Sequence, residues 1–232
     1  MGWKASTIII NRPTKVDNEE LLKTLGFDNL TKIEDELFEN AINPDDNKVY
    51  IGTYKNNLLI CTQGIPMQFF EEHETQTEKT LNQIFPNSEI CSIVLHSTIN
   101  LWGYSVIQNR QKIRARAGSA DDGTFVEIGE PLEEEKELLS KSKLDDNGNR
   151  IYLLDNFPDE PLNEDQVGEI FVFSICKRYF GDELDSADDL LFETTLTGYK
   201  YGKVKQTTST QQTNKTGSLD KIDKTKPWWK FW

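Results

Sequence analysis

The sequence predicts an α+β fold, in which several helices pack against a mostly antiparallel or mixed sheet. Segments with the composition of strands follow one another as hairpins and as a meander, separated by short turn sequences. Segments with helical periodicity and N-terminal capping residues lie between these groups of strands. Helices between hairpins are typical of an antiparallel or mixed sheet.

The first element is a short apolar strand at residues 7–10, which ends before Pro13. Asp17 and Glu20 then have the spacing of a capping box, which predicts a helix that stops near Gly26.

A second capping box, formed by Thr31 and Glu34, predicts a second amphipathic helix. It is followed by a hairpin of residues 48–54 and 58–62, with its turn at Asn56 and the neighbouring asparagine.

The middle of the chain predicts a helix over about residues 75–85 and then a strand at 90–95 that is apolar on both faces. A meander follows, with strands at residues 101–107, 111–117 and 124–128. Its turns fall near Asn109 and at Asp121.

Two further helices complete the predicted body. Residues 131–140 form a short acidic helix. Asn163 and Gln166 cap the strongest helical pattern in the chain, which runs to about Phe180 and ends at Gly181.

Charge divides the chain into three parts. The formal net charge of the 232 residues is −13, and residues 203–232 contribute seven lysines and two aspartates. Subtracting this +5 leaves about −18 for residues 1–202, which we expect to form a single α+β domain. Residues 203–226 read as a polar, basic linker, because their composition cannot bury a core. Residues 227–232 form an aromatic C-terminal motif.

Several classes of protein are disfavoured. No apolar run reaches the 18 residues of a spanning helix, and the N-terminal apolar run is too short for a signal peptide. The three cysteines predict neither a disulfide framework nor a zinc site, and no phosphate-binding loop or common catalytic motif is present. We therefore expect a soluble cytoplasmic protein with no metal and no cofactor.

Short motifs in the centre of the chain are similar to those of a bacterial family of uncharacterised proteins. They are Trp102-Gly103-Tyr104 within a strand and Gly129-Glu130-Pro131-Leu132 after the meander. The Met-Gly-x-Lys start and an aromatic-Gly pair at the end of the last long helix also fit this family. The resemblance covers most of residues 1–200 and implies a bacterial cytoplasmic protein, but no activity. The aromatic tail is not part of the pattern.

A cluster of cations is the best-localised chemical feature. Strand alternation places Lys112, Arg114 and Arg116 on one face, with Arg110 in the adjacent turn and His96 at the end of a neighbouring strand. Guanidinium groups suit phosphate or carboxylate, so these five residues are candidates for an anion site. The alternative is a solvated face whose cations pair with the abundant carboxylates. His96 is a candidate general base or a structural histidine.

The tail holds the second candidate site, formed by Trp228, Trp229, Phe231 and Trp232. Four aromatic side chains are costly to leave in water, since each can bury about 150–250 Å². They can fold back onto the body, dock on a protein partner, or lie at a membrane interface.

Two functions from different classes remain open. The first is a non-enzymatic interaction protein, with immunity-like or antitoxin-like neutralisation of a basic partner as one concrete form. The second is an enzyme or small-ligand binder that uses the cationic strand face near His96 for an anionic ligand. Nucleic acid is a poor partner for so acidic a body. Convergence of Arg114, Arg116 and His96 on one pocket would favour the second function.

Overall fold

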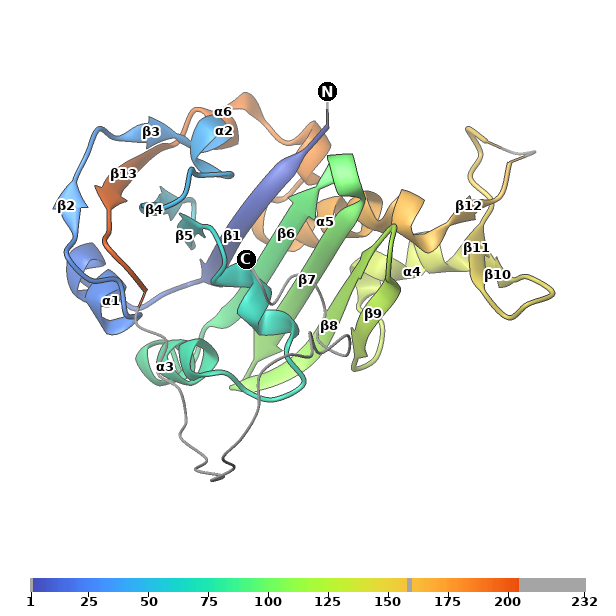
Figure 1. The fold of residues 1–232 in the computed structure, drawn as a ribbon, viewed down its shortest axis with the longest axis horizontal. Coiled ribbons are helices and arrows are strands. Elements are labelled where there is room, and N and C mark those ends of the chain that lie inside the picture. The colour runs from blue at the N-terminus through green and yellow to red at the C-terminus, as the bar shows by residue number, and fades with distance from the viewer. Residues whose placement is uncertain (1, 158–159, 205–232) are drawn as a thin grey trace, which may run out of the picture.

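A single large antiparallel sheet organises the protein. The computed structural model describes residues 2–157 and 160–204. The sheet has ten strands, nine of them in the order β2-β13-β4-β5-β1-β6-β7-β8-β9, and β3 pairs with β13 beside this path (Figure 1). Their bounds are Lys4–Asn11 (β1), Thr31–Lys32 (β2), Glu36–Leu37 (β3), Lys48–Tyr54 (β4), Asn57–Thr62 (β5), Glu89–His96 (β6), Leu101–Gln108 (β7), Gln111–Ser119 (β8), Gly123–Ile128 (β9) and Thr195–Lys200 (β13).

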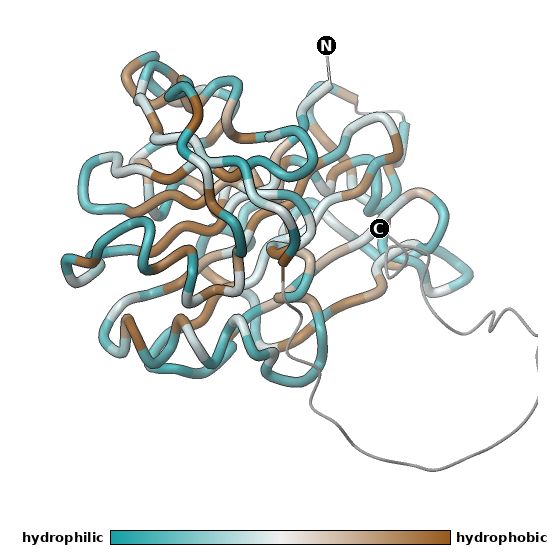
Figure 2. The backbone as a smooth tube through the Cα atoms, turned by 60° about the vertical axis from the view of Figure 1, so that its left-hand side comes forward, coloured by the Kyte–Doolittle hydropathy of each residue, from teal (hydrophilic) through white to brown (hydrophobic). Residues whose placement is uncertain are grey.

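Strand β1 lies in the middle of this sheet, between β5 and β6. Its Ile8, Ile9 and Ile10 are fully buried, because helical layers cover both faces of the sheet at this point. A run of three isoleucines is typical of a strand that is buried on both sides. In Figure 2 the hydrophobic segments follow the inner strands, whereas the outer loops are hydrophilic.

One face of the sheet is covered by α5 (Glu164–Phe180) and α4 (Glu133–Ser140), with α5 lying behind β6 and β7 in Figure 1. Helix α5 ends at Gly181, whose φ of 98° is the left-handed conformation that glycine adopts without strain. Trp102 of β7 stacks on Phe171 of α5, with the ring centroids 6.0 Å apart. These contacts form the larger of the two main cores.

The opposite face is covered by α1 (Asn18–Thr24), η1 (Pro66–Phe70) and α3 (Gln76–Ile84). Asp17 caps α1 by accepting a hydrogen bond from the Glu20 backbone N–H at 2.9 Å. Thr75 and Glu78 form the capping box of α3. Phe69 and Leu81 are fully buried in the core beneath these elements. Both helices begin where the sequence predicts them.

The predicted helix at Thr31 needs correction. Thr31 does not cap a helix: Thr31–Lys32 forms β2, Glu36–Leu37 forms β3, and only Phe38–Ala41 is helical (α2). The physical reason is β13, a strand that the sequence did not predict, which pairs with both short strands from about 160 residues further along the chain. The backbone of β13 supplies hydrogen-bond partners to β2 and β3, and a helix prediction from neighbouring residues cannot include a strand so far along the chain.

A small peripheral sheet lies beyond α4. It contains β10 (Ser142–Leu144), β11 (Arg150–Tyr152) and β12 (Leu162–Asn163). In the β10–β11 turn the carboxylate of Asp145 accepts hydrogen bonds from the backbone N–H groups of Asn147 and Asn149. The remaining short elements are η2 (Ser97–Ile99), η3 (Leu184–Ser186) and α6 (Asp189–Phe192).

The α5–β7 contact leaves no room for a side chain at Gly168. A Cβ at this position would overlap the indole ring of Trp102. We expect Gly168→Ala to lower the free energy of unfolding by about 2 kcal/mol, because overpacking outweighs the better helix propensity of alanine. Urea unfolding measures the loss of stability. The control is Lys177→Ala, at an exposed position of the same helix. A Gly168→Ala chain as stable as the wild type would contradict the close packing.

Candidate functional site

The four cations of the predicted anion site lie on the β7–β8 hairpin. Its turn is formed by Asn109 and Arg110, which both have positive φ values (52° and 63°), as the sequence predicts for a two-residue hairpin turn. Arg110 is exposed in this turn. Lys112, Arg114 and Arg116 follow in β8.

The three cations of β8 do not share one face, which corrects the expectation from simple alternation. Val106 pairs with Arg114, but the next residue, Ile107, pairs with Lys112. Ile113 is therefore the extra residue of a β-bulge, and it reverses the direction of Lys112 relative to Arg114. Lys112 faces α3, whereas Arg114 and Arg116 face α4 and α5.

Arg114 forms a buried bidentate ion pair with Glu135 of α4. The Nη2 and Nε atoms of Arg114 lie 2.7 and 2.9 Å from the two carboxylate oxygens, and the two side chains are 1% and 0% exposed. Arg114 Nη1 also donates to the carbonyl oxygen of Gly129 at 2.7 Å. Glu135 accepts a further hydrogen bond from the backbone N–H of Leu132. The pair thus joins the sheet to the start of α4, and no guanidinium edge is left for a ligand.

Electrostatics agree with this geometry. Burial lowers the pKa of Arg114, but the hydrogen bond and the charge of Glu135 outweigh it and raise the pKa above its ordinary value. Burial, together with the negative charge of Glu135, raises the pKa of the neighbouring Tyr104 hydroxyl well above its ordinary value. Arg114 therefore stays charged and Tyr104 stays neutral in this interior.

Arg116 meets Glu164, the first residue of α5. Arg116 Nη2 forms an ion pair with the Glu164 carboxylate, which also accepts hydrogen bonds from the hydroxyl groups of Thr124 and Tyr152. The Arg116 guanidinium lies over the ring of Phe171, 4.4 Å from the centroid. Glu164 lies where the dipole of α5 favours a negative charge.

A third carboxylate lies between the two arginines. Glu127 Oε1 is 3.3 Å from Arg114 Nη2 and 3.5 Å from Arg116 Nε, and its side chain is half exposed. Two guanidinium groups therefore share three carboxylates, with Glu135 and Glu164 as the other two. The local charge is negative, which disfavours an added phosphate or carboxylate ligand.

Lys112 belongs to a separate ion pair on the opposite face. Its Nζ lies 2.9 Å from Glu78 Oε1 of α3 and donates to the carbonyl oxygen of Glu71 at 2.7 Å. Burial raises the pKa of Glu78 above its ordinary 4.5, although the Thr75 backbone N–H and Lys112 lower it in part.

The raised pKa of Glu78 predicts a pH effect. The folded chain holds this proton at a higher pH than the unfolded chain, whose value is near 4.5. Glu78 therefore adds stability as the pH falls from neutral through its folded pKa toward 4.5, and this contribution is lost as the pH rises again. We expect Glu78→Gln to lose stability relative to the wild type as the pH falls through this range. Urea unfolding over this range checks it, with Glu72→Gln at an exposed position as control. A constant difference from the wild type would contradict the raised pKa.

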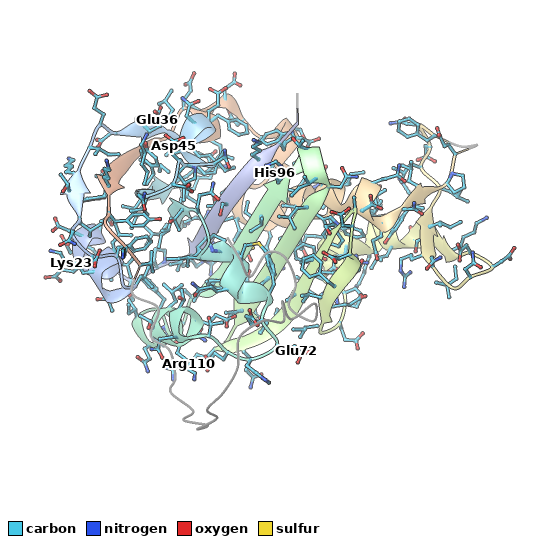
Figure 3. All side chains as sticks on the ribbon, viewed as in Figure 1. Lys23, Glu36, Asp45, Glu72, His96 and Arg110 are labelled. Atoms are coloured by element: carbon cyan, nitrogen blue, oxygen red, sulfur yellow. The ribbon has the colours of Figure 1, made fainter. Side chains whose placement is uncertain are left out.

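His96 does not converge with the arginines. It lies at the end of β6, at the opposite end of the β6–β7–β8 sheet from Arg110 (Figure 3), and on the opposite sheet face from Arg114 and Arg116. It lines a groove beside η1, and its buried Nδ1 has no hydrogen-bond partner among the described residues. The five residues of the predicted anion site therefore lie on both faces of the sheet, and His96 and Arg110 lie at its opposite ends.

The cysteines are inert in this fold. Cys61, Cys91 and Cys176 are free and fully buried. Burial raises the pKa of Cys61 to about 12 and that of Cys91 and Cys176 further above the ordinary value. A thiol with so high a pKa supplies almost no nucleophilic thiolate at neutral pH.

The described residues offer no metal site and no membrane-spanning helix. Within residues 2–157 and 160–204, no group of three or more His, Cys, Asp and Glu side chains is arranged to hold a metal ion. Among the helices of the same residues, none combines the length and apolar composition needed to cross a bilayer. The tail residues Trp228, Trp229, Phe231 and Trp232 lie outside the described residues.

Sequence reasoning found the arginines but missed their partners. Glu135 lies within a run of three glutamates that the sequence assigns only to an acidic helix, and Glu164 directly follows a helix cap. Glu135 lies at the third helical position, where a glutamate commonly turns back to the helix start, and this was the available signal. No local pattern indicates that either carboxylate meets β8.

These features define an α+β protein in which one large antiparallel sheet is joined to its helices by buried ion pairs. The model of a family of unknown function, DUF6928, matches residues 11–150, and the chain belongs to this family. This confirms the resemblance to an uncharacterised family. The match includes β8 and α4 but ends before α5. No curated protein and no solved structure matches the chain.

Proposed function

We propose that this chain is a non-enzymatic interaction protein of the bacterial cytoplasm. Either its acidic surface binds a basic protein, or its aromatic tail binds a docking groove of a protein partner. The observation that best supports this proposal is that Arg114 and Arg116 form ion pairs with carboxylates of their own chain. Both serve the interior of the protein, where three carboxylates surround them. An anion-binding enzyme or small-ligand binder at this face has less support, because an added anion would meet a site of net negative charge.

The charge of the body favours such a partner. Residues 1–202 carry about −18, obtained by removing the +5 of residues 203–232 from −13. With Arg114 and Arg116 inside, this negative charge faces solvent at positions such as Asp182 and Asp185, which are both exposed. Such a surface attracts a basic protein by electrostatic complementarity and accelerates its association. Immunity-like or antitoxin-like neutralisation is one form that this function can take.

Affinity capture from a lysate of the source cells tests the proposal. The baits are the wild-type full-length chain, the surface variant D182N/D185N, and the tail variant W228S/W229S/F231S/W232S. Gln76→Ala, an exposed neutral position, is the matched control. We expect one protein in stoichiometric amount with the wild type and the control, and a basic one if the acidic surface binds it. Its recovery should fall at high salt or in the surface variant if the acidic surface binds, or in the tail variant if the tail binds.

Two results would overturn the proposal. One is the absence of any protein enriched by the wild-type bait over empty resin. The other is a captured protein whose recovery changes with neither salt, surface charge nor tail aromatics, because such binding would use neither proposed surface.

A further inference from the structure

The groove that His96 lines has a volume of about 860 Å³. We call it the η1 groove. Its floor includes Val94 and Leu101 from β6 and β7, Met67 of η1 forms one side, and Tyr201 and Val204 lie on the other. Figure 1 shows η1 in front of the sheet, on the face away from α5. Its volume is within the range of pockets that enclose a bound group.

Apolar side chains are left partly uncovered in this groove. Ile99 is 39% exposed at its mouth, and Met67 and Leu101 are half-buried. The groove also holds polar groups suited to a mixed ligand, including the exposed Lys4 and Asp46. An apolar floor with a polar rim is typical of a surface that receives aromatic side chains.

The course of the chain after β13 indicates which segment fills the η1 groove. The last described residue, Val204, lines the η1 groove, so the rest of the chain starts from its wall. Residues 205–226, which the composition predicts to be a linker, separate this point from the aromatic motif. These 22 residues can extend to about 75 Å, which exceeds the distance needed to return to the groove. A tether of this kind gives its end a local concentration on the order of millimolar.

Charge and composition agree with this assignment. Residues 203–232 carry +5 and the remaining body about −18, so attraction brings the tail to the body. The motif of residues 227–232 combines three tryptophans and a phenylalanine with Lys230. Its aromatic rings fit the apolar floor, and its lysine can remain at the rim near Asp46.

We propose that residues 227–232 dock in the η1 groove of their own chain. In this state the tail covers Ile99, Met67 and Leu101, and a partner that binds the tail must first displace it. The inference does not depend on the partner. It is tested on the isolated protein, so its failure leaves the proposed interaction standing, and failure of the capture experiment leaves the docked tail standing.

Hydrogen exchange of the full-length chain tests the docking. We expect the backbone amides of residues 67–71 and 97–101 to exchange at least fivefold faster in the tail variant W228S/W229S/F231S/W232S than in the wild type. The amides of α5 should be unchanged. Ile99→Asp, at the mouth of the groove, should reproduce this increase with an intact tail. Leu144→Asp is the matched control, since Leu144 is 63% exposed on the distant β10.

A synthetic peptide of residues 226–232 gives an independent readout. We expect it to bind the tail variant and to bind the wild type at least tenfold more weakly, because the wild-type groove is occupied. Adding Ile99→Asp to the tail variant should remove this binding, whereas adding Leu144→Asp should not.

Four outcomes would overturn the proposal. The first is equal hydrogen exchange in the wild type and the tail variant, and the second is peptide binding that Ile99→Asp leaves intact. The third is protection of the groove amides that appears only in a dimer at high concentration. The fourth is binding of the wild-type tail to anionic vesicles with no change in the exchange of the groove amides. The third would place the tail in a second copy, and the fourth would place it at a membrane surface.

Discussion

Arg114→Met should lower the free energy of unfolding by about 3–5 kcal/mol, because it leaves the carboxylate of Glu135 buried without its counter-charge. Both side chains are essentially inaccessible to solvent, at 1% and 0% exposure, so water cannot replace the lost partner without opening the α4–sheet contact. Urea unfolding followed by circular dichroism measures the loss.

A double-mutant cycle separates the pair from its surroundings. Glu135→Met should cost a similar amount, and the double variant should cost less than the sum of the two, since an apolar pair leaves no unpaired charge. The control is Lys136→Met at the exposed Lys136–Glu133 pair, for which we expect less than about 1 kcal/mol. A loss below this value for Arg114→Met would contradict a structural role for the buried pair.

Glu164→Ala should also destabilise the protein strongly, with an expected loss of about 3 kcal/mol. It removes the counter-charge of the buried Arg116 and the acceptor used by the Thr124 and Tyr152 hydroxyl groups at the start of α5. Glu164→Gln should lose less, because an amide oxygen can still accept hydrogen bonds. Urea unfolding followed by circular dichroism measures the loss.

Glu127→Ala is the control for Glu164→Ala. Glu127 contacts both arginines but is half exposed, so Glu127→Ala should cost less than about 1 kcal/mol. If Glu127→Ala destabilised the protein more than Glu164→Ala, burial would not be the property that sets the strength of these ion pairs.

Local chemistry was sufficient to predict much of the fold. The α+β class is confirmed. Helices α1 and α5 begin at the predicted caps, because a capping residue and its partner lie within four positions of each other, and α3 begins within the predicted range. The β7–β8 turn was equally local, since asparagine tolerates the positive φ that Asn109 adopts in this two-residue turn. These features depend on neighbours in the sequence.

What the sequence could not predict depends on distant segments. β13 joins the sheet beside β4, and it converts the predicted helix at Thr31 into strand pairing. The expectation that the three cations of β8 share one face was wrong for a similar reason. One bulge residue, Ile113, turns Lys112 away from Arg114, and the carboxylates that neutralise Arg114 and Arg116 come from α4 and α5. Alternation predicts a face only as long as the strand register is regular.

Arg114 and Arg116 join β8 to the covering helices, and we propose that the protein recognises another protein rather than a small anion. The most direct test is the thermal unfolding midpoint of the full-length chain, titrated with inorganic phosphate, citrate and nucleotides at constant ionic strength. We predict that none of them raises the midpoint beyond a sodium chloride control. A saturable rise of the midpoint with one anion would contradict this proposal, because a ligand that binds the folded state stabilises it by mass action.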